Sequence, residues 1–244
     1  MSATDTAGVD RAKLAMAVEH ADGTLTDVVV TVQQAYNFGY AGREQAEVLG
    51  HVEQMRALGM PAPSRVPAIF PIPPDRVSTA TSLIAAGDQT YGEVEFALIK
   101  TAELGWVVTI ASDHTDLEVE QVKMPKAKGI CPDIVGSRAW LLSDVEPAWD
   151  ACVLRLWGTT DGEEPMLLQE GHTSHLLSPD AIIAELTQRR GGNAELPNGT
   201  VILSGTVAGE PNPSPTVWRA ELADPTSGRT LAHSYTVERL PEEL

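Results

Sequence analysis

Three carboxylates at two points of the chain could together hold a divalent metal ion. Glu93 and Glu95 flank Val94 in an expected strand, where alternation places both carboxylates on one face. On a buried face such a pair requires a cation or a shared proton, whereas on a solvated face it requires nothing. Asp113 follows a strongly apolar run, and polar clusters at the end of a buried strand often form sites. Three carboxylates suit Mg²⁺, Mn²⁺ or Ca²⁺ better than zinc.

Histidines near these carboxylates could take part in the chemistry, although each also has an ordinary structural explanation. His114 directly follows Asp113 and could be a ligand, but a lone histidine is more often a hydrogen-bonded structural residue. His51 lies four residues after Glu47 on an expected helix, so that carboxylate could orient it as a general base. An exposed histidine with a helical neighbour explains the same spacing.

Residues further along the chain could contact a substrate. Lys128 lies at an expected turn before a strand, where lysines are usually solvated. Gly205 precedes Thr206, and a missing side chain lets a ligand approach the backbone, although most such pairs are only turns. Ser204 lacks a Gly-x-Ser-x-Gly elbow, which argues against a serine hydrolase.

Composition excludes several classes of partner. Acidic residues outnumber basic ones by 34 to 17, giving a formal charge of -17, and a nucleic acid or an anionic membrane would be repelled. No apolar run approaches the roughly 20 residues of a membrane span. Two cysteines without Cys-x-x-Cys spacing disfavour a disulfide framework and thiolate zinc. Residues 1–13 lack the features of a signal peptide, so we expect a cytoplasmic protein. We also expect a small-molecule substrate.

The elements that must position these side chains are mostly strands. A helix is expected at 43–58, ending at Gly59, and a second after the capping residue Ser178. The proline-rich segment 61–74 predicts an extended connector. We expect strands at 14–18, 25–32, 92–100, 104–112, 152–157, 200–203, 217–222 and 230–237. The pattern predicts a strand-rich α+β domain at 13–244 after a flexible segment at 1–12.

Several short motifs, taken in order over residues 41–237, resemble the fumarylacetoacetate hydrolase superfamily, and within it a bacterial branch of similar length. They are Ala41-Gly42-Arg43, His51, Gly92-Glu93-Val94-Glu95, Ser112-Asp113-His114-Thr115-Asp116, Lys128-x-x-Cys131-Pro132 and the strand from Gly199 to Thr206. Each motif is short, and the order and spacing are the specific part.

The resemblance implies a mixed β-sandwich roll, a homodimer and a site built from named residues. Mg²⁺ or Mn²⁺ would be held by Glu93, Glu95 and Asp113. His51 would activate water, oriented by Glu47 or Glu53. Lys128, Gly205 and Thr206 would hold substrate oxygens, and Arg43 and His114 would be further substrate contacts.

The activity implied by the resemblance is hydrolysis of a C–C bond in a 1,3-dicarbonyl or 2-oxoacid, acylpyruvate-like substrate through a metal-stabilised enolate. Decarboxylation, tautomerisation and dehydration use the same chemistry. Leu117 replaces an arginine of the superfamily, Glu120 a glutamine, and Tyr91 a small residue. Leu117 and Glu120 support another alternative, a catalytically silent binding protein on the same fold.

Overall fold

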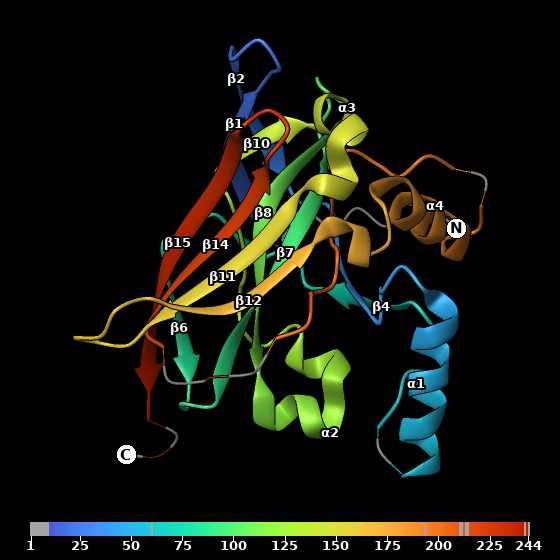
Figure 1. Cartoon of the computed structure of the whole chain (residues 1–244), viewed down its shortest axis with the longest axis vertical. Helices are drawn as coiled ribbons and strands as arrows, with labels where there is room; N and C mark the ends of the chain where they lie inside the picture. The colour runs from blue at the N-terminus through green and yellow to red at the C-terminus, as the bar shows by residue number, and fades with distance from the viewer. Residues whose placement is uncertain are drawn as a thin grey trace.

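Two mixed β-sheets pack against each other in this structure, a computed structural model that describes residues 10–59, 61–192, 194–209, 212, 215–241 and 243. Within these residues the larger sheet has ten strands and the smaller has five. Figure 1 shows the smaller sheet in front of the central strands of the larger one. Residues 1–9, most of the segment predicted to be flexible, lie outside the described residues.

The larger sheet carries the candidate site. Its strands are β1 (Lys13–Glu19), β2 (Leu25–Thr31), β3 (Gln34–Gly39), β4 (Ala68–Ile72), β5 (Val77–Ser78), β7 (Thr90–Lys100), β8 (Trp106–Asp116), β9 (Asp133–Val135), β10 (Arg138–Leu141) and β13 (Thr200–Leu203). They lie in the order β2-β1-β10-β8-β7-β13-β3-β4, with β9 beside β8 and β5 beside β9. The central pair, β7 and β8, is antiparallel over its whole length.

The smaller sheet covers one face of that central pair. Its strands are β6 (Ser82–Ala86), β11 (Val153–Thr159), β12 (Met166–His172), β14 (Val217–Asp224) and β15 (Arg229–Leu240), in the order β12-β11-β14-β15-β6. Every strand predicted from the sequence coincides with an observed strand, and the strand-rich α+β prediction is confirmed. The proline-rich segment contributes β4, which pairs only with β3 and lies at the edge, where proline is tolerated.

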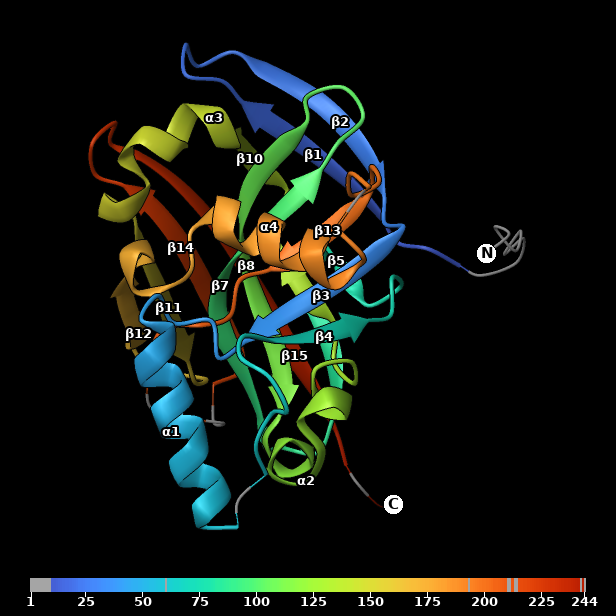
Figure 2. The same ribbon diagram turned by 90° about the vertical axis from the view of Figure 1, so that its right-hand side faces the viewer.

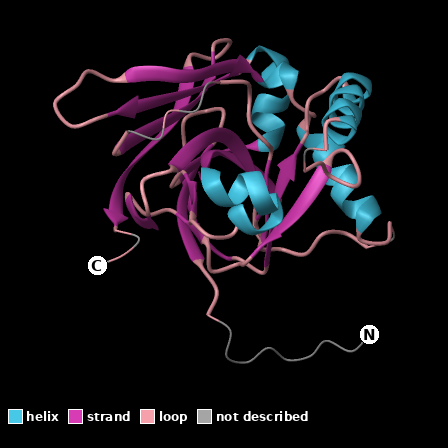
Figure 3. Ribbon diagram, turned by 90° about the horizontal axis from the view of Figure 1, so that it is seen from below, coloured by secondary structure: helices cyan, strands magenta, loops and turns pink. Residues whose placement is uncertain are grey.

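Two hydrophobic cores lie on opposite faces of the larger sheet. Phe96 and Leu98 of β7 enter the core between the sheets, together with Trp140 and Trp218. Ala97 belongs to the second core, whose members come from the strands of the larger sheet. The sheet therefore curls around its own second core, and Figure 3 shows this curvature from below. Central strands buried on both faces have few places for a charge, so each buried carboxylate there needs a partner.

The helices lie outside the sheets, as Figure 2 shows for α1 and α4. α1 (Gln45–Ala57) and α4 (Pro179–Arg189) confirm the two predicted helices, and the Ser178 hydroxyl accepts a hydrogen bond from the amide of Ala181. α2 (Leu117–Ala127) was not predicted, because Pro125 interrupts its helical pattern. Its start is nevertheless marked by Asp116, which accepts from two amides of the first turn. Short helical turns are α3 (Leu142–Val145), η1 (Glu146–Ala151) and η2 (Thr173–His175).

None of the helices in the described ranges has the length and apolar character needed to cross a membrane.

Strand β8 is longer than predicted, and this changes the position of Asp113. The sequence placed Asp113 just beyond a strand, but β8 continues to Asp116 and Asp113 pairs directly with Glu93. The polar residues stay extended because they find buried partners. Ser112 lies 2.8 Å from the Tyr235 hydroxyl, and His114 bridges that hydroxyl and Thr90.

Replacing Tyr235 with phenylalanine should therefore destabilise the fold. The change keeps the ring but removes the hydroxyl that contacts Ser112 and His114, both of which are buried. We expect the free energy of unfolding to fall by about 1–3 kcal/mol, measured by urea denaturation. Ser234→Ala, at an exposed position on the same strand, is the control and should change little. Equal stability of Tyr235→Phe and the control would contradict this account.

Candidate metal centre

Three carboxylates from the central strands converge on one point. Ligand oxygens of Glu93, Glu95 and Asp113 all lie within 4.8 Å of one another. Glu93 and Glu95 point to the same side of β7, while Val94 between them enters the hydrophobic core. Asp113 and Glu95 are buried, and Glu93 is partly exposed. Register and alternation thus place the three side chains together without a loop.

The Lys128 ammonium group lies among these carboxylates. Its Nζ is 2.5 Å from Oε2 of Glu93, 2.6 Å from Oδ2 of Asp113 and 3.5 Å from Oε1 of Glu120. Burial by itself favours the neutral amine, but the surrounding carboxylates, Asp113 foremost, outweigh it and raise the pKa of Lys128 well above its usual value. Lys128 is therefore a charged ammonium that balances a buried negative cluster.

Two neutral donors hold Glu95 in place. The Asn37 amide on β3 donates to Oε1 and Oε2 of Glu95 at 3.2 and 3.3 Å, and to Asp113 at 3.2 Å. The backbone amide of Gly205 donates to Oε2 of Glu95 at 3.0 Å. Gly205 has a φ of 82°, and a Cβ there would lie 2.5 Å from the Phe38 carbonyl oxygen. Glycine is thus required both for the backbone conformation and for the close approach.

A fourth carboxyl group, Asp133 on β9, lies beside Asp113. Asp133 is fully buried. Burial and the neighbouring charges of Asp113 and Glu95 raise the pKa of Asp133 well above its usual value. The sequence analysis missed Asp133. Its signal was its position, one residue after the Cys131-Pro132 pair.

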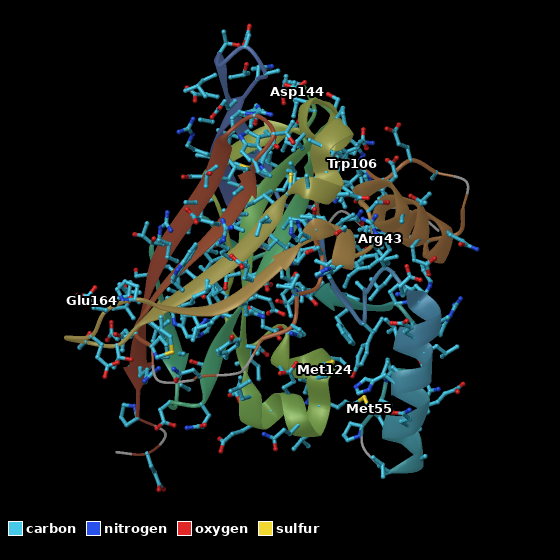
Figure 4. The ribbon with its side chains drawn as sticks, viewed as in Figure 1. Arg43, Met55, Trp106, Met124, Asp144 and Glu164 are labelled. Atoms are coloured by element: carbon cyan, nitrogen blue, oxygen red, sulfur yellow. The ribbon has the colours of Figure 1, made fainter. Side chains whose placement is uncertain are left out.

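Glu93 and Glu95 open onto a cavity of about 380 Å³, a size typical of small-molecule sites. Residues from β3, β7, α2, η2 and the segment after β13 line it: Asn37, Phe38, Gly39, Tyr40, Ala41, Gly42, Glu93, Glu95, Glu120, Met124, Lys128, His175, Leu176, Gly205, Thr206, Val207 and Ala208. Figure 4 labels Met124 on α2. The cavity thus brings together the carboxylates, Lys128 and the Gly205-Thr206 segment predicted from the sequence.

The structure does not bring the predicted water-activating group to this cavity. His51, Glu47 and Glu53 are all exposed on α1 and are not among the residues that line it. A different histidine, His175, lines the cavity and was missed by the sequence analysis. The predicted participation of the α1 residues in the reaction stays a prediction.

Two predicted substrate contacts are engaged elsewhere. Arg43 forms two hydrogen bonds to Asp150, at 2.7 and 2.9 Å, and a third to the carbonyl of Leu176. His114 is buried between Tyr235 and Thr90, and burial lowers its pKa to about 3, so it is neutral. Neither side chain lines the cavity in the described residues.

Leu117 and Glu120, where the chain departs from the superfamily that it resembles, lie in different environments. Leu117 packs against the hydrophobic core and does not line the cavity among the described residues. Glu120, by contrast, lines the cavity and lies near Lys128. Of these two departures, Glu120 is therefore the one that changes the charge of the site.

The residues present fit a divalent cation. Glu93 and Asp113 already surround a positive charge at hydrogen-bond distance, and Oδ1 of Asp113 is buried without a hydrogen-bond partner. The candidate ligands are all carboxylate oxygens, which suit Mg²⁺ or Mn²⁺. Glu95 has a pKa raised well above its usual value by burial and by Asp113, as expected for a carboxylate cluster lacking sufficient positive charge.

Solved structures of low sequence identity share the fold. Cg1458 superposes with a TM-score of 0.61 at 16% identity, covering 93% of this chain and 89% of that chain. A hexagonal crystal form of 2-keto-3-deoxyarabinonate dehydratase gives 0.62 at 13%, covering 91% and 86%. The 2-keto-3-deoxy-D-arabinonate dehydratase complexed with magnesium and 2,5-dioxopentanoate gives 0.61 at 14%, covering 88% and 77%. At such identities the similarity establishes the fold alone.

The sequence comparisons define the family. No curated protein matches the chain significantly. The model of a family described as "Protein of unknown function (DUF2848)" matches residues 38–235, which is well over half of the chain and includes the carboxylates, Lys128 and most of the cavity. The chain therefore belongs to the DUF2848 family.

Proposed function

We propose that this protein is a divalent-metal-dependent enzyme that acts on a small 2-oxoacid through its enolate. The observation that carries the proposal is the convergence of Glu93, Glu95 and Asp113, of which Glu93 and Glu95 line a cavity of small-molecule size. Support also comes from the resemblance to the fumarylacetoacetate hydrolase superfamily and from the magnesium complex of a dehydratase with the same fold.

Each group at the cavity has a chemical task in this proposal. Glu93, Glu95 and Asp113 would hold Mg²⁺ or Mn²⁺, with Asn37 and the Gly205 amide fixing the orientation of Glu95. A bound divalent ion supplies Lewis acidity that polarises a carbonyl. Lys128, once a metal ion neutralises its carboxylate partners, is free to bind the carboxylate or the developing enolate oxygen of the substrate.

The Gly205-Thr206 segment presents backbone and side-chain groups at the same cavity. The Thr206 hydroxyl donates to the carbonyl of Val94 at 2.8 Å and accepts from Gln169, so its position is fixed by the sheet. We propose that this segment contacts substrate oxygens, as the resemblance implies. A rigid contact of this kind orients a substrate at little entropic cost.

Hydrolysis of a C–C bond is one candidate reaction. It needs an activated water molecule, which His51, oriented by Glu47 or Glu53, would supply according to the resemblance. His51 lies on the exposed side of α1 and does not line the cavity, so α1 would have to approach for this reaction.

Dehydration is a second candidate, favoured by the groups that do line the cavity. It requires a proton to leave one carbon and another to reach the departing hydroxyl, without a nucleophilic water. Lys128 and Glu120 are both placed to exchange protons with a substrate in the cavity.

We also propose that the protein is a homodimer, from the resemblance, and that it is cytoplasmic, from the free cysteines Cys131 and Cys152.

The carboxylates should bind metal directly. In isothermal titration calorimetry, we expect Glu95→Gln to weaken Mg²⁺ or Mn²⁺ binding at least about tenfold, because a charged ligand becomes neutral. Glu103→Gln, in the exposed turn between β7 and β8, is the matched control and should bind like the wild type. A folded wild-type protein that binds neither ion would sink the proposed function.

Removing Lys128 should make the stability of the protein depend more strongly on a bound metal ion. Lys128→Met leaves buried carboxylates without their ammonium partner, a loss expected to cost about 3–5 kcal/mol in the metal-free protein. The same variant should bind Mg²⁺ more tightly, because no internal cation competes, and saturating Mg²⁺ should raise its Tm more than that of the wild type. An identical Tm rise in both proteins would show that Lys128 and the metal do not compete.

The reaction class can be separated with a substrate panel and one variant. We expect turnover of a monocarboxylate in the panel, an acylpyruvate or a 3-deoxy-2-oxo sugar acid, and we expect this turnover to disappear with a chelator. His51→Ala should lower kcat by about 10²–10⁴ if water activation is required, and should leave dehydration nearly unchanged. Metal binding without turnover of any panel member would favour the catalytically silent alternative.

A further inference from the structure

The cavity contains a carboxylate that is not part of the metal cluster. Glu120 lies on α2 and lines the cavity, with Oε1 3.5 Å from the Lys128 ammonium and a side chain that is 20% exposed. Glu93 and Asp113 lie about an ångström closer to the same ammonium. Glu120 is thus a peripheral partner of Lys128, and its charge faces the space that a substrate would occupy.

The charged groups leave this site negative even with a metal ion bound. Glu93, Glu95, Asp113 and Glu120 contribute four negative charges, and Lys128 contributes one positive charge. A divalent ion brings two more positive charges, so one negative charge remains. Asp133 is not among the described residues that line the cavity. A 2-oxoacid with a single carboxylate is therefore tolerated, whereas a second carboxylate would add repulsion.

No additional fixed cation is available to receive a second carboxylate. Lys128 is the sole lysine or arginine among the described residues that line the cavity. Arg43, next to the lining residue Gly42, is held by Asp150 through two hydrogen bonds. Beyond the carboxylates the wall includes the apolar side chains of Met124, Leu176 and Val207, together with polar groups such as Tyr40 and His175.

We propose that Glu120 determines substrate class, so that this cavity accepts 2-oxo monocarboxylates with an uncharged distal end and rejects dicarboxylates. The proposal rests on the proposed metal-dependent action on 2-oxoacids. The carboxylate and carbonyl of the substrate occupy the metal and Lys128, and the distal chain contacts the apolar wall. A distal carboxylate would be desolvated there beside the like charge of Glu120, with no lysine or arginine besides Lys128 among the described lining residues.

The size of the effect follows from the distance between two like charges. Two charges about 7 Å apart in a partly buried site repel enough to change an affinity by at least tenfold. Neutralising Glu120 should remove most of that discrimination between monocarboxylates and dicarboxylates. The effect should also shrink at high ionic strength, because the cavity is open to solvent and salt screens its charges.

A pair of ligands matched in chain length tests this directly. We would measure the Kd of 2-oxopentanoate and of 2-oxoglutarate by titration calorimetry, using the full chain saturated with Mg²⁺. The wild type should bind 2-oxopentanoate at least about tenfold more tightly. Glu120→Gln should narrow that ratio by about fivefold or more. Glu118→Gln, on the exposed side of the same helix turn, should keep the wild-type ratio.

The outcomes separate this inference from the proposed function. Equal affinity of the wild type for both ligands, or a ratio unchanged by Glu120→Gln, would overturn the inference while leaving 2-oxoacid binding intact. Failure of the Mg²⁺-loaded protein to bind either ligand would overturn both. The wild-type ratio at low and high salt needs no variant, so the inference stays testable if Glu120→Gln does not fold.

Discussion

Carboxylates buried side by side in a protein interior repel one another and lose their hydration, so they persist only with a compensating cation or a shared proton. The compensating cation here is Lys128, whose ammonium group lies between Glu93 and Asp113. Burial and the charges of Asp113 and Glu95 raise the pKa of the neighbouring Asp133. A site whose carboxylates surround an internal ammonium group can also bind a metal ion, because the ammonium group and the metal ion each place positive charge among the same oxygens.

The surrounding architecture serves this constraint. The long antiparallel pair β7 and β8 places Glu93 opposite Asp113, and the parallel neighbours β13 and β3 bring Gly205 and Asn37 to Glu95. Both faces of these strands are packed, so the carboxylates have little freedom to separate. The kinked helix α2 lines the cavity, carries Glu120 in its first turn and ends at the capping residue Lys128. One short segment thus supplies both the Lys128 ammonium that balances the carboxylates and the Glu120 carboxylate that faces a substrate.

The charge of the cavity links the proposed chemistry to the proposed specificity. An enolate needs positive charge nearby, which a divalent ion and Lys128 supply, whereas each added carboxylate weakens that field. Glu120 adds a negative charge near Lys128, which is the sole lysine or arginine among the described lining residues. A monoanionic substrate matches this balance. Such a site favours enolate chemistry on small, mostly apolar oxoacids.

The sequence by itself determined the local structure and the identity of the candidate ligands. β-branched runs predicted the strands, a capping serine predicted α4, and strand alternation placed Glu93 and Glu95 on one face. These features depend on neighbouring residues, so a linear pattern contains them. The tertiary structure decided which distant groups meet. Strand order brings Asp133 and Asn37 to the carboxylates. Glu120 faces the cavity because α2 lines it, whereas His51 lies outside because α1 packs at the periphery. Sheet order and helix placement depend on burial summed over the whole chain, and no short motif records that sum.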